Sequence, residues 1–579
     1  MGASSARRSL LRQALRIGLI FGIVGIYLSL VGMVETFHGR AVIAGAISLG
    51  QTMLLLTGLG TGFLVARRTP EPLRWLSIPY SAISGFLSGL VLFTLPFLGN
   101  FVDLRAMFVN ASPTLFALLT FGKGLAGGLL LLPLAGAVLG MVSALALQVP
   151  RRFLRPIGVG VTTVLIVSLF QEQLQIMLVG PAVVEAIRRF LFQAEGLTVR
   201  GASTIFLVTA LANALWGQYR EGIRQQVTQL PSAGRKSLRA IALIGGLLLV
   251  LLLPLVAGSF FAQVLVFVGL YTLMGFGLNV DLGFAGLFDL GFVAFFAIGA
   301  YTTALLTSTG PLGIAHISFW SALPIVVLMS LLAGVMLGVP VLGIRGDYLA
   351  IATLGFGEII RLLVLSDFLR PWLGGSQGIL EIPKPRIFGL ELATPQQIFY
   401  VTVAFCVVVA YIAWRLRDSR IGRAWIAIRE DEDVAAAMGI NLINAKLLAF
   451  GIGASFAGIA GAIFASMVSS VFPHSFNLFI SINVLALLIV GGLGSLPGVV
   501  VGSLVLIGLP ELLREFSEYR LLVYGAALVA MMLLRPEGLW PEPVRKRELH
   551  VEELEVTPAP EVMEEALAAT KGHVEVEGS

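Results

Sequence analysis

Long runs of apolar residues recur along this 579-residue chain from Ile17 to Leu534, and short polar or basic segments separate them. The runs are continuous and do not alternate with polar residues, which favours helices over the strands of a membrane barrel. A helix needs about 20 apolar residues to cross a hydrocarbon core of roughly 30 Å. The pattern predicts an all-α, polytopic transmembrane protein with about 15 membrane segments.

A polar and basic segment from Gln218 to Arg239, broken by Pro231 and Gly234, divides these runs into two sets. We predict an additional N-terminal membrane domain over residues 1–235 and a second membrane domain over residues 236–540. The first set of runs lies near residues 17–34, 41–66, 76–97, 113–147, 157–179 and 201–216. The second set lies near residues 240–257, 262–281, 287–308, 318–342, 349–366, 398–414, 446–469, 481–510 and 520–535.

Two of these runs are too long for a single straight span. Residues 113–147 also carry Lys123, and we expect one span plus an interfacial segment there. Residues 481–510 would reach about 45 Å as one helix, but "GGLGSLPG" interrupts them. A broken or re-entrant helix is tolerated only where it faces protein or a water-filled cavity, so this segment is a candidate wall of a translocation path.

The distribution of basic residues predicts the topology. The N-terminus, with Arg7, Arg8, Arg12 and Arg16, belongs in the cytoplasm by the positive-inside rule, and a break in 481–510 returns the C-terminus to the same side. Between the fifth and sixth runs, "PAVVEAIRRFLFQAEG" has apolar residues at helical spacing. This spacing predicts an amphipathic helix that lies on the outer face of the membrane.

Composition supports the membrane class and excludes several kinds of site. The chain is 57% hydrophobic and 12% charged, with a net charge of +6. It has one cysteine, five scattered histidines and no phosphate-binding G-x-x-x-x-G-K-[ST] loop, so we predict no metal site, no cofactor in this chain and no enzymatic activity. The glycines of "TGLGTG", from Thr57 to Gly62, lie inside an apolar run and indicate helix packing, not dinucleotide binding.

The last segment of the chain differs from the rest. Residues 541–579 contain ten acidic residues against four Lys or Arg and few large apolar side chains. Such a composition is typical of a solvated, disordered extension, and we expect a cytoplasmic tail here.

The stretch "SRIGRAWIAIREDEDVAAAMGIN", Ser419 to Asn441, concentrates charge within an otherwise apolar chain. The run of acids at 431–433 suits the first turn of a short helix, and Gly439 suits its end. Trp425 and Ile428 are expected to hold the segment at the membrane interface. The plainer interpretation is a cytoplasmic loop with a solvated acidic cluster, but a small alanine-rich helix there favours close docking of another protein.

Five motifs make the second domain similar to a known family. They are "GLNVDLGFAGLFDLGFVAFFAIGAYTTALL", "RGDYLAIATLGFGEIIRLLV", "GGSQGI", "SRIGRAWIAIREDEDVAAAMGIN" and "LIVGGLGSLPG". In this order they resemble the LivM-type permeases of branched-chain amino acid ABC transporters, over residues 237–541. No such motif precedes Ser237, so the N-terminal domain is either a set of supporting helices or a regulatory or partner-recruiting module.

The resemblance implies a permease of an ATP-driven importer in the plasma membrane of a prokaryote. It implies a LivH-like second permease, two cytoplasmic ABC ATPases that bind ATP and Mg, an extracytoplasmic substrate-binding protein and no nucleic-acid partner. It also implies that the charged stretch contacts an ATPase. The residues that match this loop are Arg423, Glu430, Asp431, Glu432, Asp433, Ala437 and Gly439.

Polar residues within apolar runs are costly, so they are candidates for a translocation path. They are Asn279, Asp281 and Asp289 around the glycine-rich "GFAG", and Glu358 with Arg361 one turn later. Each also has a structural interpretation, as a partner of unwound backbone or as an ion pair. Related permeases for urea or amides, and a transporter coupled to an ion gradient through Glu358 or Asp289, are the alternative functions.

Overall fold

A computed structural model describes residues 3–178, 182–193, 196–229, 232–344, 346–512, 517–535 and 537–541. The predicted acidic tail lies almost entirely outside these residues. The chain divides into two compact units, residues 1–246 and 247–579, here called unit 1 and unit 2. Helix α11 (Ser232–Leu278) crosses this division and breaks at Gly258, whose φ is 83°.

The predicted fold class is confirmed. Twelve helices among the described residues are long and apolar enough to cross a membrane, and three shorter apolar helices accompany them. The shorter ones cover Val293–Thr307, Leu496–Leu512 and Tyr524–Leu533. The predicted span 240–257 lies on the helical backbone of α11, but most of its side chains are outside the described set. The protein is therefore a multi-pass membrane protein built from helices.

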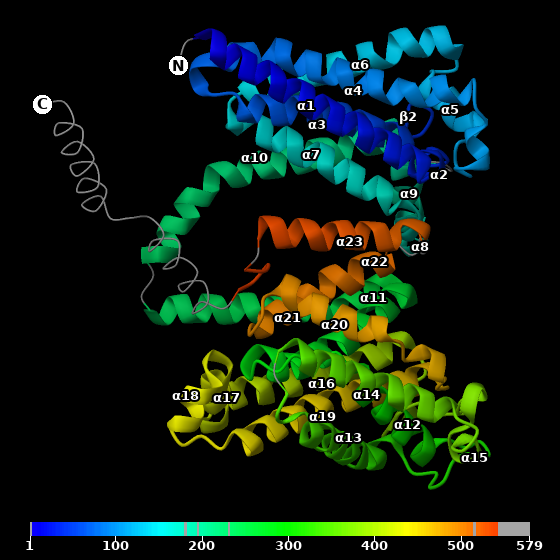
Figure 1. Cartoon of the computed structure of the whole chain (residues 1–579), viewed down its shortest axis with the longest axis vertical. Coiled ribbons are helices and arrows are strands. Elements are labelled where there is room, and N and C mark those ends of the chain that lie inside the picture. Colours follow the sequence, from blue (N-terminus) through cyan, green and yellow to red (C-terminus); the bar gives the residue numbers. More distant parts are fainter. Residues whose placement is uncertain are drawn as a thin grey trace, which may run out of the picture. The chain divides into compact units, whose positions relative to one another are not determined.

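Unit 1 is a bundle of long helices with a very small sheet (Figure 1). Helices α1, α3, α4 and α6 pack on one another, and α7 packs on α10. Short strands pair in the order β2-β1-β4-β3. The helices are α1 (Ala3–Leu30), α2 (Met33–His38), α3 (Leu49–Arg68), α4 (Ser77–Gly99), α5 (Pro113–Leu119), α6 (Gly124–Gln148), α7 (Arg151–Leu169), α8 (Gln171–Met177), α9 (Ala182–Leu191) and α10 (Val199–Gln229), with η1 (Glu71–Leu76) and η2 (Leu104–Ala106); the strands are β1 (Ala41–Ile43), β2 (Ile47–Ser48), β3 (Phe192–Gln193) and β4 (Gly196–Leu197).

Glycine contacts hold the centre of unit 1 together. A Cβ atom on Gly85 of α4 would overlap the carbonyl group of Gly136 in α6, and the reverse substitution would overlap Gly85. Close backbone approach of this kind is how small residues stabilise membrane helix pairs. The "TGLGTG" motif lies within α3, where Gly62 contacts the backbone of α6. The prediction that these glycines serve helix packing is confirmed.

The predicted division of the 113–147 run is also confirmed. Ser112 caps α5 by accepting a hydrogen bond from the Leu115 N–H, and α5 ends after Leu119. Positive φ angles at Phe121, Gly122 and Gly124 turn the chain before α6 begins. One long helix and one short segment therefore replace a single overlong span. The predicted amphipathic helix is present as α9.

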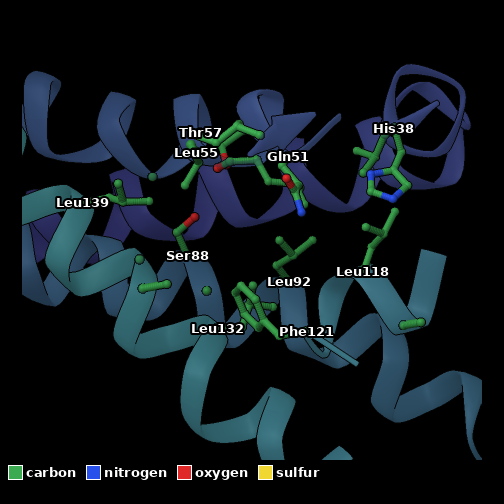
Figure 2. Close-up of a pocket in the computed structure, with 18 of the residues that line it drawn as sticks. His38, Gln51, Leu55, Thr57, Ser88, Leu92, Leu118, Phe121, Leu132 and Leu139 are labelled. Carbon is green, nitrogen blue, oxygen red and sulfur yellow. The ribbon is translucent and has the colours of Figure 1, made fainter. Parts of the chain in front are cut away.

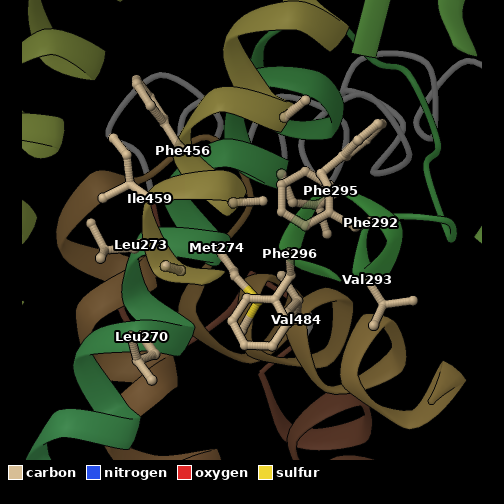
Figure 3. Packing of buried hydrophobic residues seen from close by; sticks show 14 of the residues in the cluster. Leu270, Leu273, Met274, Phe292, Val293, Phe295, Phe296, Phe456, Ile459 and Val484 are labelled. Atoms are coloured by element: carbon tan, nitrogen blue, oxygen red, sulfur yellow. The ribbon is translucent and has the colours of Figure 1, made fainter. Parts of the chain in front are cut away.

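Unit 2 is organised around α19 (Leu442–Val468), against which α12 and α13 pack. Its remaining elements are η3 (Asn279–Phe284), a π-helix; α12 (Val293–Thr307), α13 (Phe319–Val341), α14 (Asp347–Leu365), α15 (Arg370–Leu373), η4 (Gly375–Gln377), the hairpin β5 (Arg386–Ile387) and β6 (Leu390–Glu391), α16 (Pro395–Arg417), α17 (Arg420–Glu430), α18 (Glu432–Ala437), η5 (Pro473–Ser475), α20 (Leu478–Gly491), α21 (Leu496–Ser503), η6 (Leu504–Gly508), α22 (Leu509–Leu512) and α23 (Ser517–Leu534). Figure 3 shows its core, where Met274 of α11 lies beside Phe296 of α12, and Phe456 of α19 belongs to the same cluster.

The 481–510 run folds as a tight hairpin, as predicted for a re-entrant segment. Helix α20 ends at Gly491, and α21 begins after a turn in which Gly492 and Gly494 have positive φ. The two helices run back along each other, because Gly491 contacts Gly498 and Gly502 contacts Leu487. The segment Pro473–Gly491, which ends with α20, is long enough to cross a membrane, whereas Leu496–Leu512, which begins with α21, is a shorter apolar helix.

Candidate coupling and translocation site

The charged stretch forms two short helices, α17 and α18, in place of the single short helix expected from the sequence. Asp431 separates them and caps α18. Its carboxylate accepts hydrogen bonds from the backbone N–H groups of Asp433 and Val434, both at 2.9 Å. Such a cap satisfies N–H groups that lack a partner in the first turn and favours negative charge there. The predicted helix start is confirmed.

The end of α18 is fixed by Gly439, which has a φ of 85°. Its N–H donates to the Ala436 carbonyl at 3.0 Å, and the Ile440 N–H donates to the Ala435 carbonyl at 3.1 Å. This pair of bonds is the Schellman arrangement, in which a residue in the left-handed region closes a helix. The predicted helix end is confirmed, and both ends of α18 are therefore locally defined.

The position expected for Trp425 and Ile428 is wrong. Both side chains are buried in unit 2, and Trp425 has no exposed surface. Its indole N–H donates to the Ala445 carbonyl at 2.8 Å, which anchors α17 on the start of α19. An indole buried with its N–H satisfied stabilises a core contact, and it cannot reach the membrane interface.

Two basic side chains connect this segment to the rest of unit 2. The Lys446 ammonium, with only 5% of the side chain exposed, pairs with Glu432 at 2.5 Å. The Arg429 guanidinium donates to the Gly283 carbonyl at 2.8 Å and also pairs with Glu430 at 2.7 Å. Neither Lys446 nor Arg429 was among the predicted site residues. Their role depends on partners up to 146 positions away, which local sequence cannot indicate.

One face of α18 remains exposed. Val434 is 58% exposed and Met438 is 79% exposed, and Ala437 lies beside them. Arg423 is exposed on α17, where it donates to the Asp418 carbonyl at 3.0 Å. The segment thus presents a small apolar surface bordered by charge, supported from behind by buried contacts.

The Gly283 carbonyl belongs to η3, the π-helix that carries two predicted path residues. Asn279 is fully buried, and its side-chain oxygen accepts a hydrogen bond from the Gly494 N–H at 2.9 Å. Gly494 lies in the turn between α20 and α21. Arg429 and Asn279 therefore connect α17, the π-helix and the re-entrant hairpin in one series of contacts. π-Helical turns are frequent at functional sites.

Asp281 and Asp289 are the two buried carboxylates of the same region. Asp281 packs against Gly453 of α19, and neither of its oxygens has a hydrogen-bond partner within the described structure. Asp289 lies in the unwound segment before α12 and accepts a hydrogen bond from the Gly291 N–H at 2.7 Å. The expected unwinding around "GFAG" is confirmed, because residues 285–292 are not helical.

Glu358 and Arg361 pair with each other on α14, apart from the buried network. The Glu358 side chain is 46% exposed and that of Arg361 is 31% exposed. The pair thus has the geometry of the structural ion pair that the sequence also allowed. A role of this pair in the translocation path remains a prediction.

A cavity of about 310 Å³ lies beside the re-entrant hairpin in unit 2. Its wall is apolar, and its polar side chains are those of Tyr271, Ser475, Asn483, Glu511 and Tyr524. None of the five predicted path residues lines it. Asn483 and Glu511 are polar residues in or next to an apolar run. The cost of a polar side chain in such a run made Glu358 a candidate, and the same argument could have identified Asn483 and Glu511 from the sequence.

Comparison with known proteins is consistent with this architecture. The sequence profile described as branched-chain amino acid transport system / permease component matches residues 260–532. The high-affinity branched-chain amino acid transport system permease protein LivM of Escherichia coli K12 is 41% identical over 295 residues, which cover 47% of this chain and 68% of LivM. The chain belongs to this permease family.

Two other permeases match the chain at lower identity. The permease is 28% identical over 200 residues to the corresponding protein LivH of Escherichia coli K12, covering 32% of the chain and 64% of LivH. It is 25% identical over 252 residues to the autoinducer 2 import system permease protein LsrC of Escherichia coli O9:H4, covering 41% of the chain and 69% of LsrC. No solved structure matches the permease. The residues that match the family profile all lie within unit 2, and none of them belongs to unit 1.

Proposed function

We propose that the permease forms one half of the translocation pathway of an ATP-driven importer for branched-chain amino acids. The second half would be a LivH-like permease, and two ABC ATPases would bind ATP and Mg on the cytoplasmic side. An extracytoplasmic binding protein would deliver the substrate. The similarity to LivM and LivH, two permeases named for the same transport system, supports this assignment.

The observation that carries the proposal is the connection between α18 and the re-entrant hairpin. The exposed face of α18 suits contact with an ATPase. Behind it, Lys446 and Arg429 connect the segment to α19 and to the π-helix, and Asn279 connects the π-helix to the hairpin turn. When a docked ATPase moves, these contacts would transmit the movement to the hairpin, because the connected elements are packed and would shift as rigid bodies. The permease itself would carry out no covalent chemistry.

Substitution of the exposed face tests the docking site. Val434→Glu with Met438→Glu would place two charges in a contact that we expect to exclude water. We predict loss of ATPase co-purification and at least about a tenfold loss of ATP-dependent uptake, since a buried unpaired charge costs several kcal/mol. Phe388→Glu, in the fully exposed turn of the β5–β6 hairpin, is the matched control for ATPase assembly. Normal ATPase binding by the double variant would overturn the docking site.

The cavity beside the hairpin is the candidate place for substrate contact. Leu270, Met274 and Phe296 offer an apolar wall to a branched side chain, and Asn483 and Glu511 offer polar groups to the amino acid backbone. Specificity would reside mainly in the binding protein, because a tight site within the pathway would retain the substrate. The similarity to LsrC makes another small solute the second candidate.

Uptake by the reconstituted complex distinguishes these substrates. We expect ATP-dependent uptake of labelled leucine, with competition by isoleucine and valine. Urea, simple amides and autoinducer 2 should not compete at equal concentration. Competition by one of these solutes, without competition by valine, would replace the proposed substrate and leave the permease assignment unchanged.

A further inference from the structure

Unit 1 contains a partly open apolar cavity that is not part of the proposed transport pathway. Its volume is about 550 Å³, and α2 to α6 surround it (Figure 2). Ligand sites in proteins have volumes of roughly 300–1,000 Å³ and combine apolar walls with a few polar groups. This cavity therefore has the size and the character of a binding site.

The wall of the cavity restricts the chemistry of a ligand. It is made mainly of leucines, glycines and alanines, and no described residue that lines it is an Asp, Glu, Lys or Arg. An ionised head group would lose its hydration there without a charged partner, which is costly. An uncharged, mostly apolar molecule would gain free energy, because the cavity removes its apolar surface from water.

Several polar side chains line this space, and Gln51 and Ser88 face it from different helices. Ser88 of α4 is only 5% exposed, and it lines the cavity. Gln51 of α3 uses its side-chain oxygen to accept from the Ser48 N–H, which leaves its NH₂ group available. Figure 2 shows the Gln51 amide and the Ser88 hydroxyl pointing toward the same cavity. Both groups can therefore hydrogen-bond to a molecule in the cavity.

The cavity is elongated along the helices. On α3 it extends from Gln51 to Gly58, seven residues or about 10 Å of helix. His38 lies at the Gln51 end, where its Nδ1 atom is 2.9 Å from the Ser48 hydroxyl group. The opposite end has Gly58, Leu139 and Thr57, whose hydroxyl group already donates to the Leu54 carbonyl at 2.7 Å within the same helix. One end is therefore polar and the other suits a hydrocarbon chain.

We propose that unit 1 binds a single hydrocarbon chain with an uncharged hydrogen-bonding head group, in the cavity between α3, α4 and α6. The Gln51 amide and the Ser88 hydroxyl hold the polar part, and the leucines enclose the chain. The chain has two potential sources: a bilayer lipid, or a free amphiphile such as a monoacylglycerol. The proposal is independent of the transported substrate, because the cavity lies in unit 1.

Photolabelling of the full-length permease in phosphatidylcholine nanodiscs tests the site. The probe is monodecanoylglycerol with a diazirine group at the end of its chain. We expect the label on α3, α4 and α6, identified by mass spectrometry of the peptides. Ser88→Ala should lower the yield about threefold, because one hydrogen bond contributes about 0.5–1.5 kcal/mol.

Matched variants separate filling of the cavity from general effects of a bulky side chain. Leu55→Trp fills the cavity, whereas Leu56→Trp adds the same side chain to the exposed face of α3. We expect at least about a fivefold loss of label in the first variant and a normal yield in the second. Ala135→Phe and the exposed Val138→Phe repeat the comparison on α6, in case Leu55→Trp fails to fold.

Competition identifies the source of the chain. Displacement of the label by unlabelled monodecanoylglycerol would support a free amphiphile. Native mass spectrometry that finds a phospholipid on the wild type and on Leu56→Trp, but not on Leu55→Trp, would support a bilayer lipid. Equal labelling of Leu55→Trp and Leu56→Trp, or of Ala135→Phe and Val138→Phe, would overturn the proposal.

Discussion

The two units are both helical membrane domains, but they differ in the charged side chains that they bury. Every buried Asp, Glu, Lys or Arg among the described residues lies in unit 2: Asp281, Asp289 and Lys446. The buried polar side chains described in unit 1 are hydroxyl groups and the amides of Gln171 and Gln173. Charge inside a membrane domain costs free energy and tends to mark functional positions. From this comparison we propose that unit 2 carries the transport machinery and that unit 1 supports it.

The largest expected effect tests this division directly. In Gly461→Val the new Cβ atom would overlap the Phe296 carbonyl group, so α12 and α19 must separate. Overpacking of this kind costs about 1–3 kcal/mol or more. We expect uptake to fall below about a tenth of the wild-type rate. The control is Gly355→Val on α14, where an added Cβ meets no atom within 4 Å.

A glycine-to-valine substitution in the core of unit 1 gives the measurement to compare with Gly461→Val. Gly136→Val would overlap Gly85 and should destabilise unit 1 to a similar extent in thermal unfolding. We expect the assembled complex to keep at least about half of its uptake if unit 1 only supports the permease. Equal losses of uptake for Gly136→Val and Gly461→Val would show that unit 1 is part of the transport machinery.

A buried ion pair in unit 2 and an exposed one in unit 1 should differ in their contribution to stability. Lys446→Met leaves Glu432 without its ammonium partner, and we expect a loss of about 1–3 kcal/mol in the free energy of unfolding. The corresponding pair in unit 1, Arg40 with Glu172 at 3.0 Å, is more exposed. Arg40→Met should therefore cost less than about 1 kcal/mol.

A double variant gives the internal control for this pair. Glu432→Gln with Lys446→Met removes both charges, and we expect it to recover at least about half of the lost stability, because the carboxylate that lost its ammonium partner is neutralised as well. Unfolding in denaturant, measured on purified protein, checks all three variants. No recovery would show that Lys446 acts through packing and not through its charge.

Arg429→Ala should affect coupling more than folding. It removes the hydrogen bond to the Gly283 carbonyl, and we expect uptake to fall about threefold to tenfold, while ATPase co-purification persists. Arg415→Ala, an exposed basic residue at the end of α16, is the matched control. Loss of ATPase binding in Arg429→Ala would make Arg429 a docking residue and would weaken the inferred connection to the π-helix.

The smallest expected effect concerns a partly exposed ionic contact in unit 1. A hydrogen bond from Arg188 is the main cause that lowers the pKa of Glu185, with smaller contributions from Arg189. A carboxylate with a lowered pKa contributes stability above its unfolded pKa, about 4.5 here, and loses it as the pH falls through the folded value. We expect a small decrease in melting temperature from about pH 6 to pH 3, which Glu185→Gln should reduce. An unchanged pH dependence in Glu185→Gln would assign the effect to other carboxylates.

Much of the candidate coupling segment follows from local sequence. The acids at 431–433 and Gly439 define the start and end of α18, since capping depends on residues within one turn of the helix ends. The position of Trp425 was predicted wrongly for the opposite reason. An aromatic side chain on an amphipathic helix suits a membrane interface and a protein core equally well, and only its neighbours decide between them.

The sequence by itself determined the membrane class, the approximate bounds of most apolar helices, and the break within residues 481–510. These features depend on the length and continuity of apolar runs, which any bilayer selects. Only the tertiary structure brought Arg429 to Gly283, Asn279 to Gly494 and Lys446 to Glu432. It also formed the cavity that Gln51 and Ser88 face. Such contacts join residues that are distant in the chain, so they depend on how the helices pack and not on the composition of any one of them.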